Sequence, residues 1–331
     1  MIKFFAVFSI LIFLIGCRSE EKTALDSDVD FTDQGREVPA FSSESAFAFV
    51  EQQLAFGPRN PNSEGHRNAA AWFEETLREY AGRNAVFVQR FDHEGYQETL
   101  HLKNIIAAFN PTATDRILLS AHWDTRPRAE HDDDPDRRDE PLMGADDGGS
   151  GVAVLLELAR IMAENPPPVG VDIILFDGED YGEEGDLSNY FLGSRYWSAN
   201  PPVPGYSPRF GILLDMVGGE GALFPRELYS TRYAPTVQNE VWRIAAELGF
   251  ERFLDEPGMF VQDDHVILNE VYGLPTINII HQSRDGIRFD SGSQWTFPPY
   301  WHTHRDDIDI IDPQVMQEVG EVLLELIYNR L

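Results

Sequence analysis

The chain has 331 residues, of which 42% are hydrophobic and 12% aromatic, so it contains enough apolar material for one large buried core. Acidic residues outnumber basic residues 56 to 26, which gives a formal net charge of -30. Because such a surface repels phosphate backbones, the composition excludes nucleic acid as a partner, and the single cysteine excludes an intrachain disulfide.

The first residues are typical of an export signal. Lys3 precedes an apolar run over residues 4–15, which is too short to span a bilayer comfortably as a helix. The sequence LIGC at residues 14–17 resembles the lipobox of bacterial lipoproteins, in which the cysteine is lipidated and becomes the new N-terminus. The alternative is an ordinary hydrophobic leader in which Cys17 is incidental.

These features predict three segments. We expect a signal peptide over residues 1–16, a lipidated Cys17 with an acidic tether over 17–38, and a folded domain over 39–331. The protein is then an exported bacterial lipoprotein of the cell envelope, anchored to a membrane by lipid and facing the periplasm or the surface.

The folded domain shows alternating helical and strand patterns. Apolar residues at helical spacing predict helices over 46–54 and 69–80, the first of them entered through Ser42, Ser43 or Ser45. Strands are predicted at 86–91, 102–107, 116–121, 171–176, 211–217 and 275–280, and further helices at 151–163, 236–248 and 313–331. The later strands are continuously apolar, which indicates an α/β fold: a single domain whose central, twisted, mixed but mostly parallel sheet has helices on both faces.

Ionisable residues stand at the ends of the core strands. They are His122 and Asp124 after the first continuously apolar strand, Asp177, Glu179 and Asp180 after the second, and Asp215 within the third. Ligands of open α/β sheets bind beyond the carboxyl ends of the strands. Carboxylates that converge there repel one another unless a cation lies between them, so the pattern predicts a metal.

Three residues are candidate ligands of a catalytic zinc ion, which takes three carboxylate or imidazole ligands and keeps one position open. They are Asp147 in GADDGGSG, Asp180 in FDGED and His302 in YWHT. Each has a simpler interpretation. Asp147 could cap the helix near residue 151, Asp180 could be a loop acid, and His302 could be a surface histidine.

Seven short segments occur in one order along the chain: His122-Trp123-Asp124, Gly144-Ala145-Asp146-Asp147, Asp177-Gly178-Glu179-Asp180, Gly193-Ser194-Arg195, Leu213-Leu214-Asp215, Asp263-Asp264-His265 and Trp301-His302-Thr303. This ordered set resembles the signature of the zinc aminopeptidase superfamily called M28. Within it, the chain is most similar to animal-type glutaminyl cyclases and their bacterial lipoprotein relatives, over about Phe41 to Leu331.

The resemblance implies a zinc aminopeptidase-like catalytic domain over 39–331, with zinc held by Asp147, Asp180 and His302. Glu179 is then the general acid and base. Many relatives have two consecutive glutamates where this chain has Glu179-Asp180, and the shorter aspartate requires the metal to lie nearer that strand.

Further roles follow from the same resemblance. Asp215 is expected to hydrogen-bond the network around Glu179, and Asp264 to contact the leaving amide. Trp301 and Phe297 are expected to shape a narrow pocket. The implied reaction converts the N-terminal glutamine of peptides or proteins into pyroglutamate and releases ammonia.

A second hypothesis is that the protein is an aminopeptidase of the same superfamily. Its hydrolases bind a second zinc ion through residues that match His122 and Asp215, with the residue that matches Asp147 as the bridge, and all three are present here. One zinc ion is therefore expected for a cyclase and two for an aminopeptidase. The predicted loop over 181–192 is longer than peptidases usually have, which favours the cyclase, and the intact Glu179 disfavours a third possibility, a binding protein without activity.

Overall fold

The computed structural model describes residues 29–288 and 292–331. The predicted signal peptide, Cys17 and the first part of the predicted tether lie outside these residues. The described part of that tether, residues 29–38, runs along the body: Phe31 packs against the core, and the Thr32 N–H donates to the carbonyl of Arg330 at 3.2 Å. Within the described residues, no helix has both the length and the apolarity needed to cross a bilayer.

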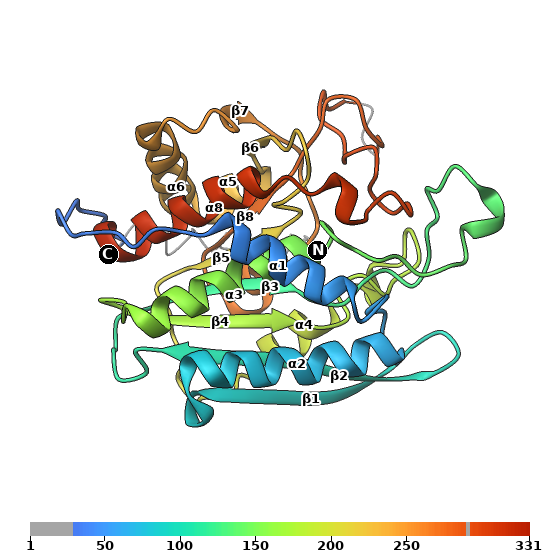
Figure 1. The fold of residues 1–331 in the computed structure, drawn as a ribbon, viewed down its shortest axis with the longest axis horizontal. Coiled ribbons are helices and arrows are strands. Elements are labelled where there is room, and N and C mark those ends of the chain that lie inside the picture. The colour runs from blue at the N-terminus through green and yellow to red at the C-terminus, as the bar shows by residue number, and fades with distance from the viewer. Residues whose placement is uncertain (1–28, 289–291) are drawn as a thin grey trace, which may run out of the picture.

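A mixed sheet of six strands forms the centre of the molecule, in the order β1-β2-β4-β3-β5-β8 (Figure 1). Its strands are β1 (Val86–Glu94), β2 (Thr99–Phe109), β3 (Arg116–His122), β4 (Gly170–Phe176), β5 (Gly211–Asp215) and β8 (Thr276–Ile280). β4, β3, β5 and β8 are mutually parallel, whereas β1 and β2 form an antiparallel edge. The predicted fold class is therefore confirmed.

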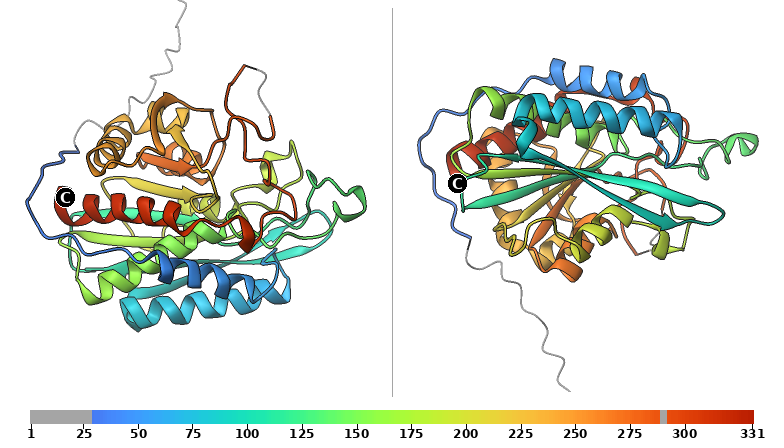
Figure 2. Two further views of the ribbon diagram at one scale, coloured as in Figure 1. Left: turned by 45° about the horizontal axis from the view of Figure 1, so that its top comes forward. Right: turned by 90° about the horizontal axis from the view of Figure 1, so that it is seen from below.

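Helices cover both faces of this sheet, as the edge-on view in Figure 2 shows. One face carries α1 (Ser43–Leu54), α2 (Glu64–Ala81), α3 (Gly149–Glu164) and α8 (Pro313–Glu325); the other carries α4 (Leu192–Ala199) and α7 (Asp264–Ile267). Along β3, Ile117 and Leu119 belong to the larger core and Leu118 to the core on the opposite face. Because both faces are buried, the central strands read as continuous apolar runs.

The first two predicted helices each begin directly after a serine that acts as the N-cap. Ser42 caps α1 by accepting a hydrogen bond from the Ser45 N–H at 3.2 Å, and Ser63 caps α2 in the same way through the His66 N–H. The last predicted helix continues beyond α8 as a π-helical turn, Leu326–Arg330.

Several short elements were not predicted from the sequence, among them α4, α5 (Leu228–Tyr233), α7, β6 (Phe224–Arg226) and β7 (Phe253–Pro257). β6 and β7 form a small separate sheet, next to α5 and the predicted α6 (Pro235–Leu248). The predicted strand over 211–217 ends at Asp215, because Met216 adopts a left-handed backbone with φ 49°.

The strand register brings the ionisable strand ends to one edge of the sheet. His122, the last residue of β3, pairs with Phe176 of β4, and Asp215, the last residue of β5, pairs with Ile280 of β8. The loops that follow these strands therefore start side by side, and the site lies among them.

Candidate metal centre and active site

The structure brings together the three residues expected to bind zinc. The ligand atoms of Asp147, Asp180 and His302 all lie within 4.8 Å of one another, and all three side chains are buried. His302 Nε2 is 3.5 Å from Asp180 Oδ1 and 3.7 Å from Asp147 Oδ2. Two carboxylates and one imidazole at this spacing fit a catalytic zinc ion with an open fourth position.

The backbone leading into α3 directs Asp147 toward this centre. Gly148, with φ 73°, is the N-cap residue and leaves the helix without a side-chain cap, so Asp147 does not serve as one. A side chain at Gly148 would lie 2.9 Å from the His122 ring, which explains the glycine. The buried carboxylate of Asp306 accepts the N–H groups of Asp146 at 2.7 Å and Asp147 at 3.1 Å, and so fixes this turn.

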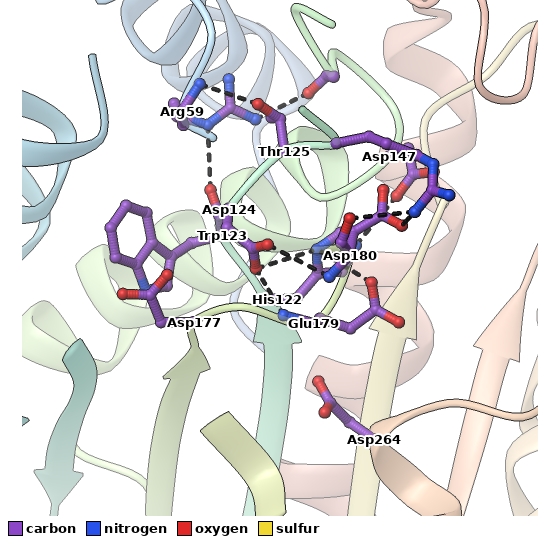
Figure 3. A network of polar contacts seen from close by, with 12 residues as sticks. Arg59, His122, Trp123, Asp124, Thr125, Asp147, Asp177, Glu179, Asp180 and Asp264 are labelled. Atoms are coloured by element: carbon purple, nitrogen blue, oxygen red, sulfur yellow. Dashed lines mark hydrogen bonds and ion pairs between the residues drawn. The ribbon is translucent and has the colours of Figure 1, made fainter. Parts of the chain in front are cut away.

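The loop after β4 is held by residues that follow β3 (Figure 3). The buried Asp124 carboxylate accepts the N–H groups of Glu179 at 3.0 Å and Asp180 at 3.2 Å. Arg126, which is also buried, donates to Asp180 Oδ1 at 2.7 Å and to the Tyr190 hydroxyl at 2.9 Å. Asp180 is thus oriented both by its own backbone and by a guanidinium behind it.

His302 is held in a conformation that a histidine seldom adopts. Its φ of 54° is left-handed, a backbone strain that persists in folded proteins mainly at functional sites. The Trp301 ring stacks on the imidazole with centroids 3.5 Å apart, and Glu130 Oε1 lies 3.3 Å from His302 Nδ1. The indole and the carboxylate fix the ring so that Nε2 faces the two aspartates.

Burial sets the charge state of these ligands. It lowers the pKa of His302 to about 4, with the Arg126 cation adding to the effect, so the imidazole is neutral, as a metal ligand must be. Burial also raises the pKa of Asp180 well above its ordinary value, and the Asp147 charge contributes to this shift. A bound cation relieves this repulsion between carboxylates.

A second group of ligand atoms shares Asp147 with the first. His122, Asp147 and Asp215 also lie within 4.8 Å of one another, with His122 Nε2 3.1 Å from Asp147 Oδ1 and 3.3 Å from Asp215 Oδ1. The arrangement that the resemblance implies for a second metal, with Asp147 as the bridge, is therefore geometrically available. A third group, Glu130, His131 and His302, was not predicted from the sequence.

A cavity of about 310 Å³ opens over the metal ligands. One wall is aromatic: Trp301 stacks on Phe297 with centroids 4.4 Å apart and on His131 with centroids 5.2 Å apart. Another part of the lining, which we call the acidic wall, consists of Glu179, Asp215 and Asp263. Glu184, Gly185, Leu187, Tyr190 and Phe191, all in the predicted 181–192 loop, also line the cavity, as do Glu130 and residues 260–262.

Carboxyl groups of the acidic wall have raised pKa values. Burial raises the pKa of Glu179 well above its ordinary value, and the charges of Asp180 and Asp263 add to the shift. Burial also raises the pKa of Asp215. Carboxyl groups crowded in this way share protons instead of all being ionised.

Asp264 lies deeper than its neighbour Asp263. Asp263 lines the cavity, and its carboxylate accepts a hydrogen bond from the Asn278 amide at 2.6 Å. Asp264 has no exposed surface, accepts a hydrogen bond from the Ser194 hydroxyl at 2.5 Å, and is set apart from the cluster around His122 (Figure 3). Burial raises the pKa of Asp264 to about 7.

Arg59, from the segment between α1 and α2, ties the ligand loops together. Its fully buried guanidinium donates to the carbonyl of Trp123 at 3.1 Å (Figure 3). It also donates to the carbonyls of Met143 at 2.9 Å and Gly144 at 2.8 Å. The first carbonyl follows β3, and the other two precede Asp147. One cation thus connects two loops of the site and lies among its buried carboxylates.

An α/β sheet with buried carboxylates and an imidazole converging at the carboxyl ends of its parallel strands defines a metal-dependent enzyme. Residues 104–327 match the model of peptidase family M28. The chain belongs to this family, and zinc is its metal cofactor.

Relatives of known structure extend the comparison over nearly the whole chain. A Bacteroides thetaiotaomicron glutaminyl cyclase bound to N-acetylhistamine is 41% identical, with a TM-score of 0.81, over 88% of this chain and 99% of that one. A Zn-dependent exopeptidase from Parabacteroides distasonis is 40% identical, with a TM-score of 0.82, over 89% of this chain and 100% of that one.

A curated relative is more distant. The glutaminyl-peptide cyclotransferase of Drosophila melanogaster is 26% identical over 247 residues, which are 67% of this chain and 63% of the relative. The chain thus matches somewhat less than two thirds of that protein's length.

Proposed function

We propose that this protein is a glutaminyl-peptide cyclotransferase, which converts the N-terminal glutamine of peptides or proteins into pyroglutamate and releases ammonia. The observation that carries the proposal is the cavity of about 310 Å³, which is lined by three metal ligands, by the Trp301–Phe297 stack and by the carboxylates of Glu179, Asp215 and Asp263. This volume lies at the small end of ligand sites and suits one amino acid with a flat, polar side chain. The similarity to bacterial glutaminyl cyclases supports the same activity.

The substrate supplies its own nucleophile, the α-amine, so the protein has to fold the glutamine and move one proton. The amine nitrogen bonds to the side-chain amide carbon while the bond from that carbon to the amide nitrogen breaks. Glu179 takes a proton from the amine and returns it to the departing nitrogen, which leaves as ammonia. Asp215 and Asp263 flank Glu179 on the same wall, and the Trp301 indole excludes water from the reacting groups.

Zinc held by Asp147, Asp180 and His302 would supply Lewis-acid polarisation of the glutamine side-chain carbonyl. The Trp301 ring and the acidic wall both line the cavity, and they limit where that carbonyl can lie. The contact expected between Asp264 and the leaving amide remains part of the proposal; this buried carboxylate also accepts a hydrogen bond from the Ser194 hydroxyl.

A second candidate, hydrolysis of N-terminal residues by an aminopeptidase, is favoured by one observation. The group His122, Asp147 and Asp215 provides the donors of a second metal site that shares Asp147 with the first. With two metals, Glu179 would accept a proton from a water molecule that attacks the peptide carbonyl, and not from the substrate's own amine.

The reaction product separates the two candidates. The purified protein, incubated with a peptide that begins with glutamine, is expected to release ammonia and to leave a blocked peptide lighter by one ammonia. A peptide that begins with leucine is the matched control and should stay intact. Release of free glutamine or free leucine would contradict the cyclase function and support the aminopeptidase function.

We also propose that the chain is exported and anchored by lipid at Cys17, with residues 1–16 removed. The apolar run and the LIGC sequence support this proposal. Cys17→Ser is expected to move the protein from the membrane fraction to the soluble envelope fraction, because one lipidated residue provides the whole anchor. Ser19→Ala, two residues away, should leave the distribution unchanged. If Cys17→Ser remained fully in the membrane fraction, lipid anchoring at this residue would be excluded.

A further inference from the structure

An exposed aromatic surface continues outward from the mouth of the cavity. Phe260 lines the cavity, yet 59% of its surface is exposed, an unusual position for so large an apolar side chain. Its ring meets Tyr229 edge to face with centroids 4.9 Å apart, and Tyr229 stacks on Tyr233 with centroids 6.2 Å apart. The three rings, which we call the aromatic ladder, lead from the cavity onto α5.

The ladder is held rigidly against the active-site segment. One carboxylate oxygen of the buried Glu227 accepts the N–H groups of both Tyr229 at 2.8 Å and Val261 at 3.1 Å. Gln262, which also lines the cavity, donates from its side-chain amide to the Tyr229 hydroxyl at 2.6 Å. Because α5 and the cavity wall are fixed to each other in the folded protein, binding at the ladder requires little further ordering.

We propose that the aromatic ladder is a binding subsite for an apolar side chain, above all an aromatic one, at the second position of a glutamine-initiated substrate. The proposal rests on the proposed cyclase function. The cavity has room for the first residue only, so the rest of the peptide must leave through the mouth. Successive side chains of an extended chain point to opposite sides, so only one of the two residues after the glutamine can lie on the ladder. Phe260 lines the cavity itself, so we assign the ladder to the second side chain, which is the nearer one.

The physical preference follows from the ring geometry. An aromatic side chain can add to the ladder by offset or edge-to-face contact and cover the exposed Phe260 ring, whereas alanine leaves that ring in water. We expect the wild-type protein to process a Gln-Phe-Gly amide about tenfold more efficiently than a Gln-Ala-Gly amide, measured as kcat/KM.

The test compares this ratio in the full-length protein and two variants. Phe260→Ser should reduce the Phe-to-Ala ratio to about one. The control, Phe87→Ser, replaces a ring on β1 that is 50% exposed and remote from the cavity, and it should keep the tenfold ratio. General damage to the protein lowers both rates together and leaves the ratio unchanged, so the ratio reports on the subsite alone.

Two outcomes contradict the proposals in distinguishable ways. If both peptides are cyclised at equal rates by the wild type, or if Phe260→Ser keeps the preference, the subsite is refuted while the cyclase stands. If neither the two peptides nor glutamine amide releases ammonia, the proposed cyclase function is refuted. The subsite is then refuted as well, because it is proposed for a cyclase substrate.

Discussion

Glu179→Gln is expected to lower kcat for glutamine-initiated peptides by about 10² to 10⁴-fold while zinc stays bound. The substitution keeps the size of the side chain and removes its ability to accept and return a proton. Zinc should remain because, among the described residues, Glu179 belongs to none of the three groups whose ligand atoms converge. Steady-state kinetics and metal analysis of the same preparation measure the two effects together.

The control for this prediction is Glu183→Gln. Glu183 lies on the same loop, but its side chain is exposed and does not line the cavity. It should therefore keep the wild-type rate. Near-normal turnover by Glu179→Gln would remove Glu179 from the mechanism, and loss of zinc from that variant would reassign it as a structural ligand.

Arg59→Met is expected to have the largest effect on the integrity of the site. The change deprives the buried carbonyls of Trp123 and Gly144 of a donor, at about 1–3 kcal/mol for each, and also the half-buried carbonyl of Met143. It also removes a cation from among the carboxylates of Asp124 and Asp306. We expect a fall of at least about 3 kcal/mol in the free energy of unfolding, and zinc affinity weaker by about 10 to 100-fold.

Two further variants show whether the charge or the geometry of Arg59 matters. Arg59→Lys keeps the charge but has no planar fork for three carbonyls, so it should recover only part of the stability and zinc affinity. Arg67→Met removes an exposed arginine of α2 that donates to the Asn62 carbonyl, and should change little. Denaturant unfolding with competitive zinc titration measures both quantities. Wild-type stability and zinc affinity in Arg59→Met would contradict the role of Arg59 in holding the two loops of the site together.

Most of the sheet was predictable because its central strands are buried on both faces. β3 and β4 are continuously apolar and end in ionisable residues, and this pattern located both the strands and the edge where the site lies. β6 and α5 are three and six residues long, which is too short for a periodic pattern to appear. Their position depends on packing against distant segments.

The candidate ligands were predictable because they follow core strands or belong to short motifs. Asp263 lines the cavity and stands beside Asp264, the acid predicted to contact the leaving amide, but the sequence alone does not say which of two adjacent acids faces a cavity. Asp306, four residues after His302, carried no signal because its role is to accept two backbone N–H groups. Arg59 gave none either, since its partners are backbone carbonyls that any residue could supply.

The proposed activity depends on a zinc ion held by Asp147, Asp180 and His302. The most direct measurement is anomalous X-ray scattering from crystals of the zinc-loaded protein, recorded on both sides of the zinc absorption edge. We predict one strong peak at bonding distance from these three side chains, about 2.0–2.2 Å from the donor atoms. A peak elsewhere, or none, would contradict the proposed centre, and a second full peak between His122 and Asp215 would favour the aminopeptidase.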